Sequence, residues 1–270
     1  MIIVGELINS TRRRVEKAIT DSDISMIQEL ARAQAEAGAH YIDVNAGTFD
    51  KEEDRYLNWL IENVLDVVDI PCCIDSPNPK AINSALRRHQ EISSLVPMIN
   101  SISLEKKRYG DMLTMLSGTD LKVVALCMSD DGLPETAYDR LQIADKLING
   151  LVKKNVALDN IYVDPLVQSI SVNPIFGVEF CKSLDLIKKE FKGIHFMCGL
   201  SNISYGMPAR KHVNQAFMSM AISHGLDGAI IDPLDKKMTT SIVTAEALSG
   251  TDEYCLNFFK AYRAGDIAVI

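Results

Sequence analysis

The stretch IYVDPLV at residues 161–167 shows the pattern that decides the fold. It opens with three apolar residues, and Asp164 and Pro165 interrupt the run. A short continuous apolar run, without strict alternation, is typical of a strand buried on both faces of a parallel sheet. The stretch therefore predicts a buried strand whose carboxyl end carries a polar residue.

Seven other stretches repeat this pattern along the chain. They are IIVGEL (2–7), YIDVNAG (41–47), IPCCIDS (70–76), SLVPMINS (94–101), KVVALCM (122–128), HFMCGLSN (195–202) and GAIIDPL (228–234). Successive stretches begin 24 to 39 residues apart, which is the spacing of strand–helix–strand units. The chain therefore predicts eight such units.

The segments between the strands have the features of amphipathic helices with defined ends. Residues 23–37 form an apolar stripe, with N-cap candidates at Asp21 to Asp23 and Gly38 as the terminator. Asn78 and Pro79 give an N-cap and first-turn pair for the following helix. Further helices are expected over 136–153 and over 209–224, before Gly225.

Eight strand and helix pairs without a flexible linker favour an α/β fold, a single (β/α)8 TIM barrel over residues 1–270. An open doubly wound sheet is the alternative. No G-x-G-x-x-G follows the first strand, as a dinucleotide fold of that type would require.

The composition argues against several classes of protein. With 28 Lys and Arg against 36 Asp and Glu, the formal charge is −8, which disfavours a nucleic-acid-binding protein. No apolar run approaches the ~20 residues of a membrane span, and the N-terminus lacks a secretory signal, so we expect a cytoplasmic protein. The six cysteines lack metal-site spacing, and we expect buried thiols.

Polar residues gather at the predicted carboxyl ends of the strands, where barrel active sites lie. They are Glu6, Asn9, Asp43, Asn45, Asp75, Asn100, Asp164, Ser201, Asn202 and Asp232. Any one of them could simply cap a turn. The whole set is rich in acceptors and indicates a ligand rich in donors, either a flat heterocycle such as an aminopyrimidine or a Mg²⁺ ion. The histidines form no zinc-binding pair, and no metal ligand is assigned.

Six motifs distinguish between these ligands. The chain contains GELIN (5–9), DVNAG (43–47), IDS (74–76), MINS (98–101), YVDPL (162–166) and GLSN (199–202). In this order and spacing, the set resembles the methyltetrahydrofolate:corrinoid protein methyltransferases, pterin-binding barrels related to dihydropteroate synthase. The resemblance covers essentially the whole chain.

The resemblance implies roles for individual residues. Asp75 and Asp164 would hold the pterin ring, Asn100 would contact it, and Asn202 would be the catalytic residue that hydrogen-bonds near N5. The remaining candidate substrate contacts that it implies are Glu6, Asp43, Asn45, Gly199, Ser201, Arg210 and Asn214.

The resemblance also implies the substrates and partners. Tetrahydrofolate or 5-methyltetrahydrofolate would be the substrate, in the one-carbon metabolism of an anaerobe. The chain lacks the D-x-H-x-x-G corrinoid motif, so a separate corrinoid protein would supply the cobalt. The direction of transfer is not readable from these residues. The family is typically homodimeric, although for Phe258, Phe259 and Tyr262 we expect packing against the barrel.

Two other functions stay open at this level. A dihydropteroate synthase-like enzyme would need basic residues on the last strands to hold a pyrophosphate, and strand 228–234 lacks the Arg-x-His of that family. A non-catalytic pterin-binding protein is the other alternative, and its mark would be a disrupted set of residues at the strand ends.

Overall fold

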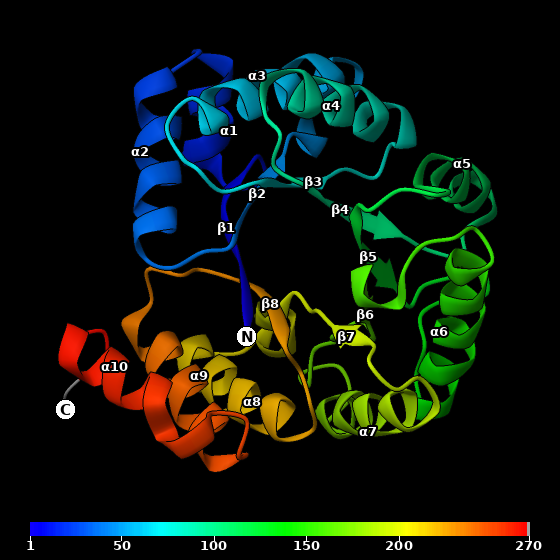
Figure 1. Ribbon diagram of the computed structural model, residues 1–270, viewed down its shortest axis with the longest axis vertical. Coiled ribbons are helices and arrows are strands. Elements are labelled where there is room, and N and C mark those ends of the chain that lie inside the picture. Colours follow the sequence, from blue (N-terminus) through cyan, green and yellow to red (C-terminus); the bar gives the residue numbers. More distant parts are fainter. Residues whose placement is uncertain (269–270) are drawn as a thin grey trace.

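The eight predicted strands form a ring of parallel strands surrounded by helices (Figure 1). The computed structural model describes residues 1–268. Its strands are β1 (Ile2–Asn9), β2 (Tyr41–Asn45), β3 (Cys72–Asp75), β4 (Met98–Ile102), β5 (Lys122–Leu126), β6 (Ile161–Asp164), β7 (His195–Phe196) and β8 (Gly228–Ile231). Each strand pairs with its neighbours in chain order, and β1 pairs with β8. The sequential order confirms the barrel and excludes the doubly wound alternative.

The ring closes between its two last strands through a short connection. β7 is only two residues long, and beyond it Gly199 forms a single parallel bridge to Ile230. The backbone N–H of Ile230 donates to the carbonyl of Cys198 at 2.9 Å. The predicted stretch 195–202 therefore contributes only a short strand, and the rest of it is the loop that carries the GLSN motif.

Within the described residues, ten α-helices cover the outside of the ring. They are α1 (Arg13–Thr20), α2 (Ile24–Glu36), α3 (Glu53–Leu65), α4 (Pro79–Ile92), α5 (Lys106–Leu116), α6 (Ala137–Val152), α7 (Phe176–Glu190), α8 (Arg210–Ser223), α9 (Lys236–Leu248) and α10 (Leu256–Ala264). Short 3-10 helices are η1 (Gly47–Glu52), η2 (Leu158–Asn160), η3 (Leu200–Ser204) and η4 (Glu253–Cys255). No helix among residues 1–268 has the length and apolar character that a bilayer crossing requires.

The predicted helix ends are confirmed by their caps. The side chain of Asp23 accepts a hydrogen bond from the N–H of Met26, and that of Asn78 accepts one from Lys80, both at 3.1 Å. Gly38 and Gly225 take the left-handed conformation after α2 and α8, with φ of +89° and +101°. Each cap satisfies backbone groups that the helix end leaves without a partner.

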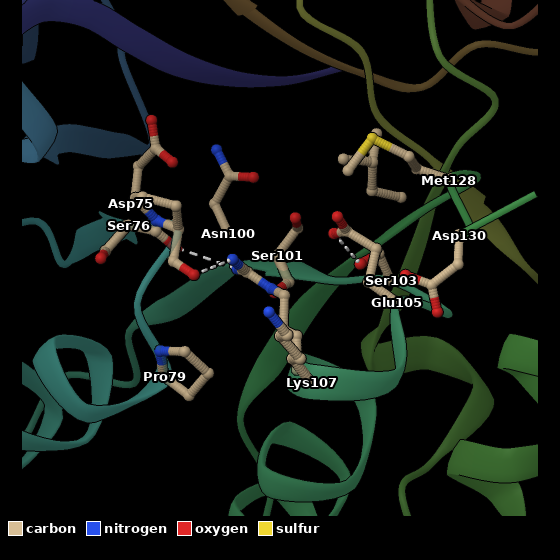
Figure 2. A pocket seen from close by; sticks show the side chains of 13 residues that line it. Asp75, Ser76, Pro79, Asn100, Ser101, Ser103, Glu105, Lys107, Met128 and Asp130 are labelled. Carbon is tan, nitrogen blue, oxygen red and sulfur yellow. Dashed lines mark hydrogen bonds between the residues drawn. The ribbon is translucent and has the colours of Figure 1, made fainter. Parts of the chain in front are cut away.

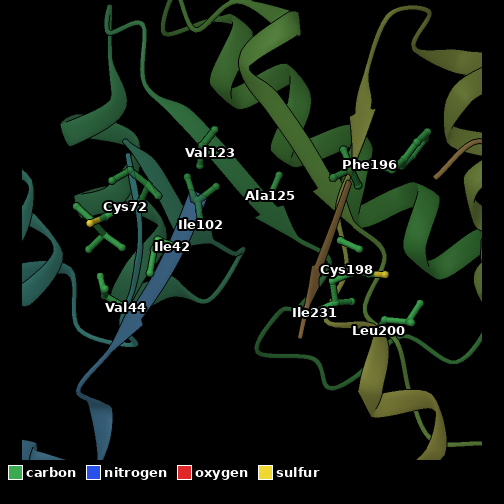
Figure 3. Close-up of a cluster of buried hydrophobic side chains, with 14 of the residues drawn as sticks. Ile42, Val44, Cys72, Ile102, Val123, Ala125, Phe196, Cys198, Leu200 and Ile231 are labelled. Carbon is green, nitrogen blue, oxygen red and sulfur yellow. The ribbon is translucent and has the colours of Figure 1, made fainter. Parts of the chain in front are cut away.

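Apolar side chains form two separate layers. Outward-facing residues of the strands pack under the helices, among them Ile42, Val44 and Ile102 (Figure 3). A smaller cluster fills the barrel interior; it consists of Val4, Tyr41, Cys73, Met98, Val124, Tyr162 and Met197. The interior is therefore a packed core at its amino-terminal end.

The inward faces change from apolar to polar toward the carboxyl ends. Side chains two positions apart in a strand share a face. The pairs that follow this rule are Val4 and Glu6, Cys73 and Asp75, Met98 and Asn100, and Tyr162 and Asp164, while β2 continues from Tyr41 through Asp43 to Asn45. The polar set that the sequence predicts at the strand ends is thus built directly on the interior core.

The structure differs from the sequence expectations in the C-terminal helix. α10 has no buried residue, and Phe259 and Tyr262 are 51% and 62% exposed, whereas Phe258 is half-buried. The expectation that these three aromatic residues pack into the core is wrong. The reason is that α10 lies outside α9 and contacts that helix, so no apolar layer covers its outer face. Among the cysteines, five are buried free thiols and Cys255 is half-buried.

Candidate active site

A cavity of about 490 Å³ opens at the carboxyl ends of β3, β4 and β5. Asp75 and Asn100 line one side of it, and Met128 and Asp130 line the other (Figure 2). Asp75 and Asn100 are register partners on β3 and β4, so their side chains enter the cavity together. Two of the predicted substrate contacts therefore share one pocket.

Asn45 holds the carboxyl group of Asp75 in place. Asn45 is the register partner of Asp75 on β2, and its Nδ2 donates to Oδ2 of Asp75 at 2.9 Å. Burial raises the pKa of Asp75 to about 6, while the hydrogen bond from Asn45 and the charge of Arg108 lower it. Above this pH the carboxylate is ionised and can accept hydrogen bonds from a ligand in the cavity.

Arg108 is a cavity residue that the sequence reasoning missed. It lies in the first part of α5, and its guanidinium donates to the carbonyls of Ser76 at 2.9 Å, Pro77 at 2.6 Å and Ser101 at 3.0 Å. These contacts join the loop after β3 to the end of β4. The acceptors are backbone carbonyls, which every residue has, so no sequence motif marks the contact.

Asp164 lies at the end of β6 and is 8% exposed. Burial raises its pKa to about 7, although hydrogen bonds from the N–H groups of Leu166 and Gly199 and the charge of Arg140 lower it. Arg140, also missed by the sequence reasoning, is fully buried in α6 and donates to the carbonyl of Pro165 at 2.8 Å. This arginine anchors the loop that positions Asp164.

Asn202 lies in η3 at the rim, immediately beyond the bridge that closes the barrel. Its side chain is exposed and makes no hydrogen bond to any part of the described chain, residues 1–268. It caps no helix, because the N-cap of α8 is Ala209. A Cβ atom at Gly199 would lie 3.4 Å from Nδ2 of Asn202, so the glycine leaves room for the amide. Asn202 is therefore available to a ligand.

The other predicted contacts have different surroundings. Arg210 donates to the carbonyl of Ser201 at 2.7 Å and to Oγ of Ser204 at 3.0 Å, which supports the loop of Asn202. Glu6 forms a 2.7 Å ion pair with Arg12 at the rim. Asn214 is half-buried in α8, and its Oδ1 has no hydrogen-bond partner within residues 1–268. The structure thus gives Arg210 a supporting contact and gives Asn214 no contact that explains a binding role.

Asp43 is placed more deeply than its sequence position suggests. It was expected near the end of its strand, but it lies in the middle of β2 and is 2% exposed. Its neighbours are Asp75, Cys73 and Asn100, and it does not line the cavity.

The arrangement is rich in oxygen acceptors. Within the described range 1–268, no three His, Cys, Asp or Glu side chains lie in an arrangement that could hold a metal ion. Two carboxylates and the amides of Asn100 and Asn202 stand at one end of the barrel, on β3, β4, β6 and η3. Such a set suits a flat heterocycle that presents ring N–H and amino donors.

Comparison with known proteins identifies the family. The model of the family described as "Pterin binding enzyme" matches residues 5–232. The chain belongs to the pterin-binding enzyme family. It is also 34% identical to a methylcorrinoid:tetrahydrofolate methyltransferase of Eubacterium limosum, with 100% of this chain and 99% of the relative covered. The resemblance to the folate and corrinoid methyltransferases is therefore confirmed.

Other known proteins match more distantly. A methionine synthase of Mycobacterium tuberculosis is 24% identical over 86% of this chain, which corresponds to 20% of that enzyme. Among solved structures, dihydropteroate synthases of Yersinia pestis and Coxiella burnetii superpose with TM-scores of 0.71 and 0.69. Both are 15% identical to the chain and cover 93% of it, with 94% of their own chains covered, and they support the barrel fold alone.

Proposed function

We propose that the protein is a methyltransferase that moves a methyl group between N5 of tetrahydrofolate and the cobalt of a separate corrinoid protein. The observation that carries the proposal is the complete polar set, Asp75, Asn100, Asp164 and Asn202, at the strand ends of a pterin-binding barrel. The physiological direction that we propose is methylation of tetrahydrofolate, as in the name of the full-length relative. Residues 1–270 would form one catalytic domain.

The polar set assigns a role to each part of the folate. Asp75 and Asp164 are buried carboxyl groups that can accept hydrogen bonds from the ring N–H and the exocyclic amine of the pterin. Asn100 lines the same cavity as Asp75 and can bond the remaining polar edge. Glu6, Asn45, Gly199, Ser201 and Arg210 would shape or support the site. We assign Asn214 no more than a peripheral contact.

Asn202 is the residue that we place at N5. The corrinoid supplies a methyl group bound to cobalt and keeps the bonding electron pair when the methyl group leaves. N5 uses its lone pair to form the new N–C bond, and the resulting ammonium then releases its proton to solvent. The side-chain carbonyl of Asn202 can accept a hydrogen bond from the N–H of that ammonium. In the reverse direction, the amino group of Asn202 can donate a hydrogen bond to N5 as the C–N bond breaks. A positioned amide of this kind stabilises charge that develops in the transition state.

A dihydropteroate synthase activity fits the chain less well. That reaction needs basic side chains near the last strands to hold a pyrophosphate. Here Arg210 is engaged with Ser201 and Ser204, and Lys211 pairs with Asp235 at 3.2 Å. A non-catalytic pterin-binding protein is also less well supported. Its polar residues at the strand ends would be disrupted, whereas this chain has all four, Asp75, Asn100, Asp164 and Asn202.

We also infer a homodimer, with the contact on the α7 and α8 face. An apolar groove of about 460 Å³ separates these helices; it is lined by Ile170, Val178, Val213, Ala216, Phe217 and Met220, among others. Val178 and Met220 remain 47% and 46% exposed, and contiguous exposed apolar surface of this kind is typical of a protein–protein contact. Met220→Glu should give the monomer mass in light scattering, with Val152→Glu on α6 as control. Equal masses for both variants would argue against this face.

The decisive experiment follows the corrinoid spectrum. The purified protein is mixed anaerobically with tetrahydrofolate and a methylated corrinoid, and the cobalt oxidation state is read from the absorbance. We expect loss of the methyl–cobalt spectrum and formation of 5-methyltetrahydrofolate, and the reverse change with 5-methyltetrahydrofolate and Co(I). Folate binding without a spectral change in either direction would instead support a non-catalytic protein. Turnover of a dihydropterin pyrophosphate with p-aminobenzoate would support the synthase alternative.

A further inference from the structure

Asp43 is a buried carboxyl group that ligand binding alone does not explain. It lies in the middle of β2, below the cavity that Asp75 and Asn100 line. It is 2% exposed, and its Oδ1 has no hydrogen-bond partner within the described residues 1–268. An ionised carboxylate in such a place would leave one charged oxygen without a donor from the described chain, which is costly.

The groups around Asp43 come from three neighbouring strands and give little compensation for a charge. On β3 they are Cys73 and Asp75, on β1 Glu6, and on β4 the amide of Asn100. Two of these groups are carboxyls themselves. Burial raises the pKa of the Cys73 thiol well above its usual value, so this neighbour stays protonated and neutral.

The environments of Asp43 and Asp75 differ in the donors that they provide. Asp75 accepts a 2.9 Å hydrogen bond from Asn45, and the guanidinium charge of Arg108 also favours its ionised form. For Asp43, burial and the charge of Asp75 raise the pKa well above the usual value, and the neighbouring Cys73 thiol and Asn100 amide only partly oppose this shift. Neighbouring carboxyl groups whose environments differ in this way divide into one acid and one carboxylate.

We propose that Asp43 and Asp75 form a carboxylic acid–carboxylate pair in which Asp43 keeps the proton and positions Asp75 and Asn100 for the substrate. The pair carries a single negative charge, and that charge stands on the member that faces the cavity. The neutral Asp43 then supports the amide of Asn100 from below without competing for the ligand's donors. The positioning role rests on the proposed function, whereas the protonation state of Asp43 does not.

The protonation state is tested on the folate-free protein by infrared spectroscopy. The spectrum of Asp43→Asn is subtracted from that of the wild type at pH 7.5. We expect the difference to contain the C=O stretch of a protonated carboxylic acid. Asp145→Asn on the surface of α6 is the matched control and should remove carboxylate intensity instead. A carboxylate difference for Asp43→Asn would overturn the proposal, and this result does not depend on whether folate is the substrate.

The positioning role is tested by folate affinity in two variants. Asp43→Asn keeps a neutral group of the same shape, so we expect its tetrahydrofolate affinity to stay within about threefold of the wild type. Asp43→Leu removes the polar group that lies beside the amide of Asn100, and we expect a loss of about tenfold or more. If Asp43→Asn loses as much affinity as Asp75→Asn, the charge of Asp43 is needed and the proposal fails. Thermal unfolding of each variant verifies that it is folded.

Discussion

Asn45 Nδ2 donates a hydrogen bond to Asp75 Oδ2 at 2.9 Å, across the ladder between β2 and β3. The carbonyl oxygen of the Asn45 side chain determines the orientation of this amide. Oδ1 of Asn45 accepts hydrogen bonds from the hydroxyl of Ser10 at 3.1 Å and from the N–H of Gly47 at 2.9 Å. Two donors therefore hold the carbonyl side, and the amino side must face the carboxyl group. The DVNAG motif thus prepares the carboxylate of the IDS motif before any ligand binds.

Removal of this amide should weaken folate binding. Asn45→Ala leaves one oxygen of Asp75 without its donor, and a hydrogen bond to a charged group contributes roughly 1.5–3 kcal/mol. We expect tetrahydrofolate affinity to fall by at least about tenfold in isothermal titration calorimetry. Asn149→Ala on the exposed surface of α6 is the control and should bind normally. Equal affinity of the two variants would show that Asp75 needs no support from Asn45.

Asp75 itself should be required for binding. Asp75→Ala removes the ionised acceptor that lines the cavity and leaves the amino group of Asn45 without its acceptor. We expect no measurable tetrahydrofolate binding at pH 7.5 by calorimetry. In the wild type, affinity should fall as the pH drops through about 6, where Asp75 takes up a proton. A pH-independent affinity would mean that this carboxylate does not contact the pterin.

The barrel and the polar strand ends could be predicted because both follow from local periodicity. Continuous apolar runs mark buried strands. Side chains two positions apart share a face of the strand, so Asn100 lies on the same face as Met98, and Asp164 on the same face as Tyr162. The conformation of the segment after β7 could not be predicted in this way. It reads as part of a strand, but Gly199 makes only one bridge and the backbone turns into η3.

Supporting residues were harder to find from the sequence. Arg108 and Arg140 act through backbone carbonyls of distant loops, and neither the identity nor the spacing of those partners is encoded in a motif. The depth of Asp43 depends on the register of β2 against β3, which is a tertiary property. Exposure of Phe259 and Tyr262 likewise depends on what packs on α9, and a helical apolar pattern does not specify a partner.

His195 should make stability pH-dependent at the opposite end of the barrel. Its ring nitrogens lie 2.6 Å from Asp227 and 3.0 Å from Asp159. Burial lowers its pKa, but the hydrogen bonds and charges of the two aspartates outweigh burial and raise it overall. A raised histidine pKa stabilises the fold below the unfolded value, and this contribution is lost as the pH rises through the folded value.

The test compares His195→Gln with the wild type in urea unfolding at pH 5.5 and 8.5. We expect the variant to lose more stability at pH 5.5, by no more than about 1 kcal/mol for each partly exposed pair. His212→Gln, at an exposed position on α8, is the control. The His195 ring also stacks on that of Tyr162, with 5.0 Å between the ring centroids. A loss that is the same at both pH values would show that this stacking, and not charge, explains the role of His195.

Asn202 should separate catalysis from binding. Its amide is at the rim, and in the proposed complex Asp75 and Asn100 hold the ring deeper in the cavity. Asn202→Ala should therefore keep tetrahydrofolate affinity within a few-fold of the wild type. Loss of a preorganised hydrogen bond to the reacting atom costs about 10²-fold or more in kcat. Single-turnover kinetics and calorimetry measure the two effects separately. Equal loss of rate and affinity would assign Asn202 to ground-state binding only.

Asp164 should lower the stability of the folate-free protein as the pH rises. The unfolded chain releases this proton near pH 3.8, whereas the folded chain keeps it to about 7. The unfolded state therefore binds fewer protons between these values, and the free energy of unfolding falls across this window, by at most about 4 kcal/mol. Asp164→Asn cannot ionise, so its urea unfolding midpoint should rise relative to that of the wild type between pH 5 and 8.

The surface variant Asp145→Asn is the control, and its urea midpoint should change with pH as that of the wild type does. Parallel curves for Asp164→Asn and the wild type would mean that Asp164 already carries its charge at pH 5, with the N–H groups of Leu166 and Gly199 sufficient to stabilise it.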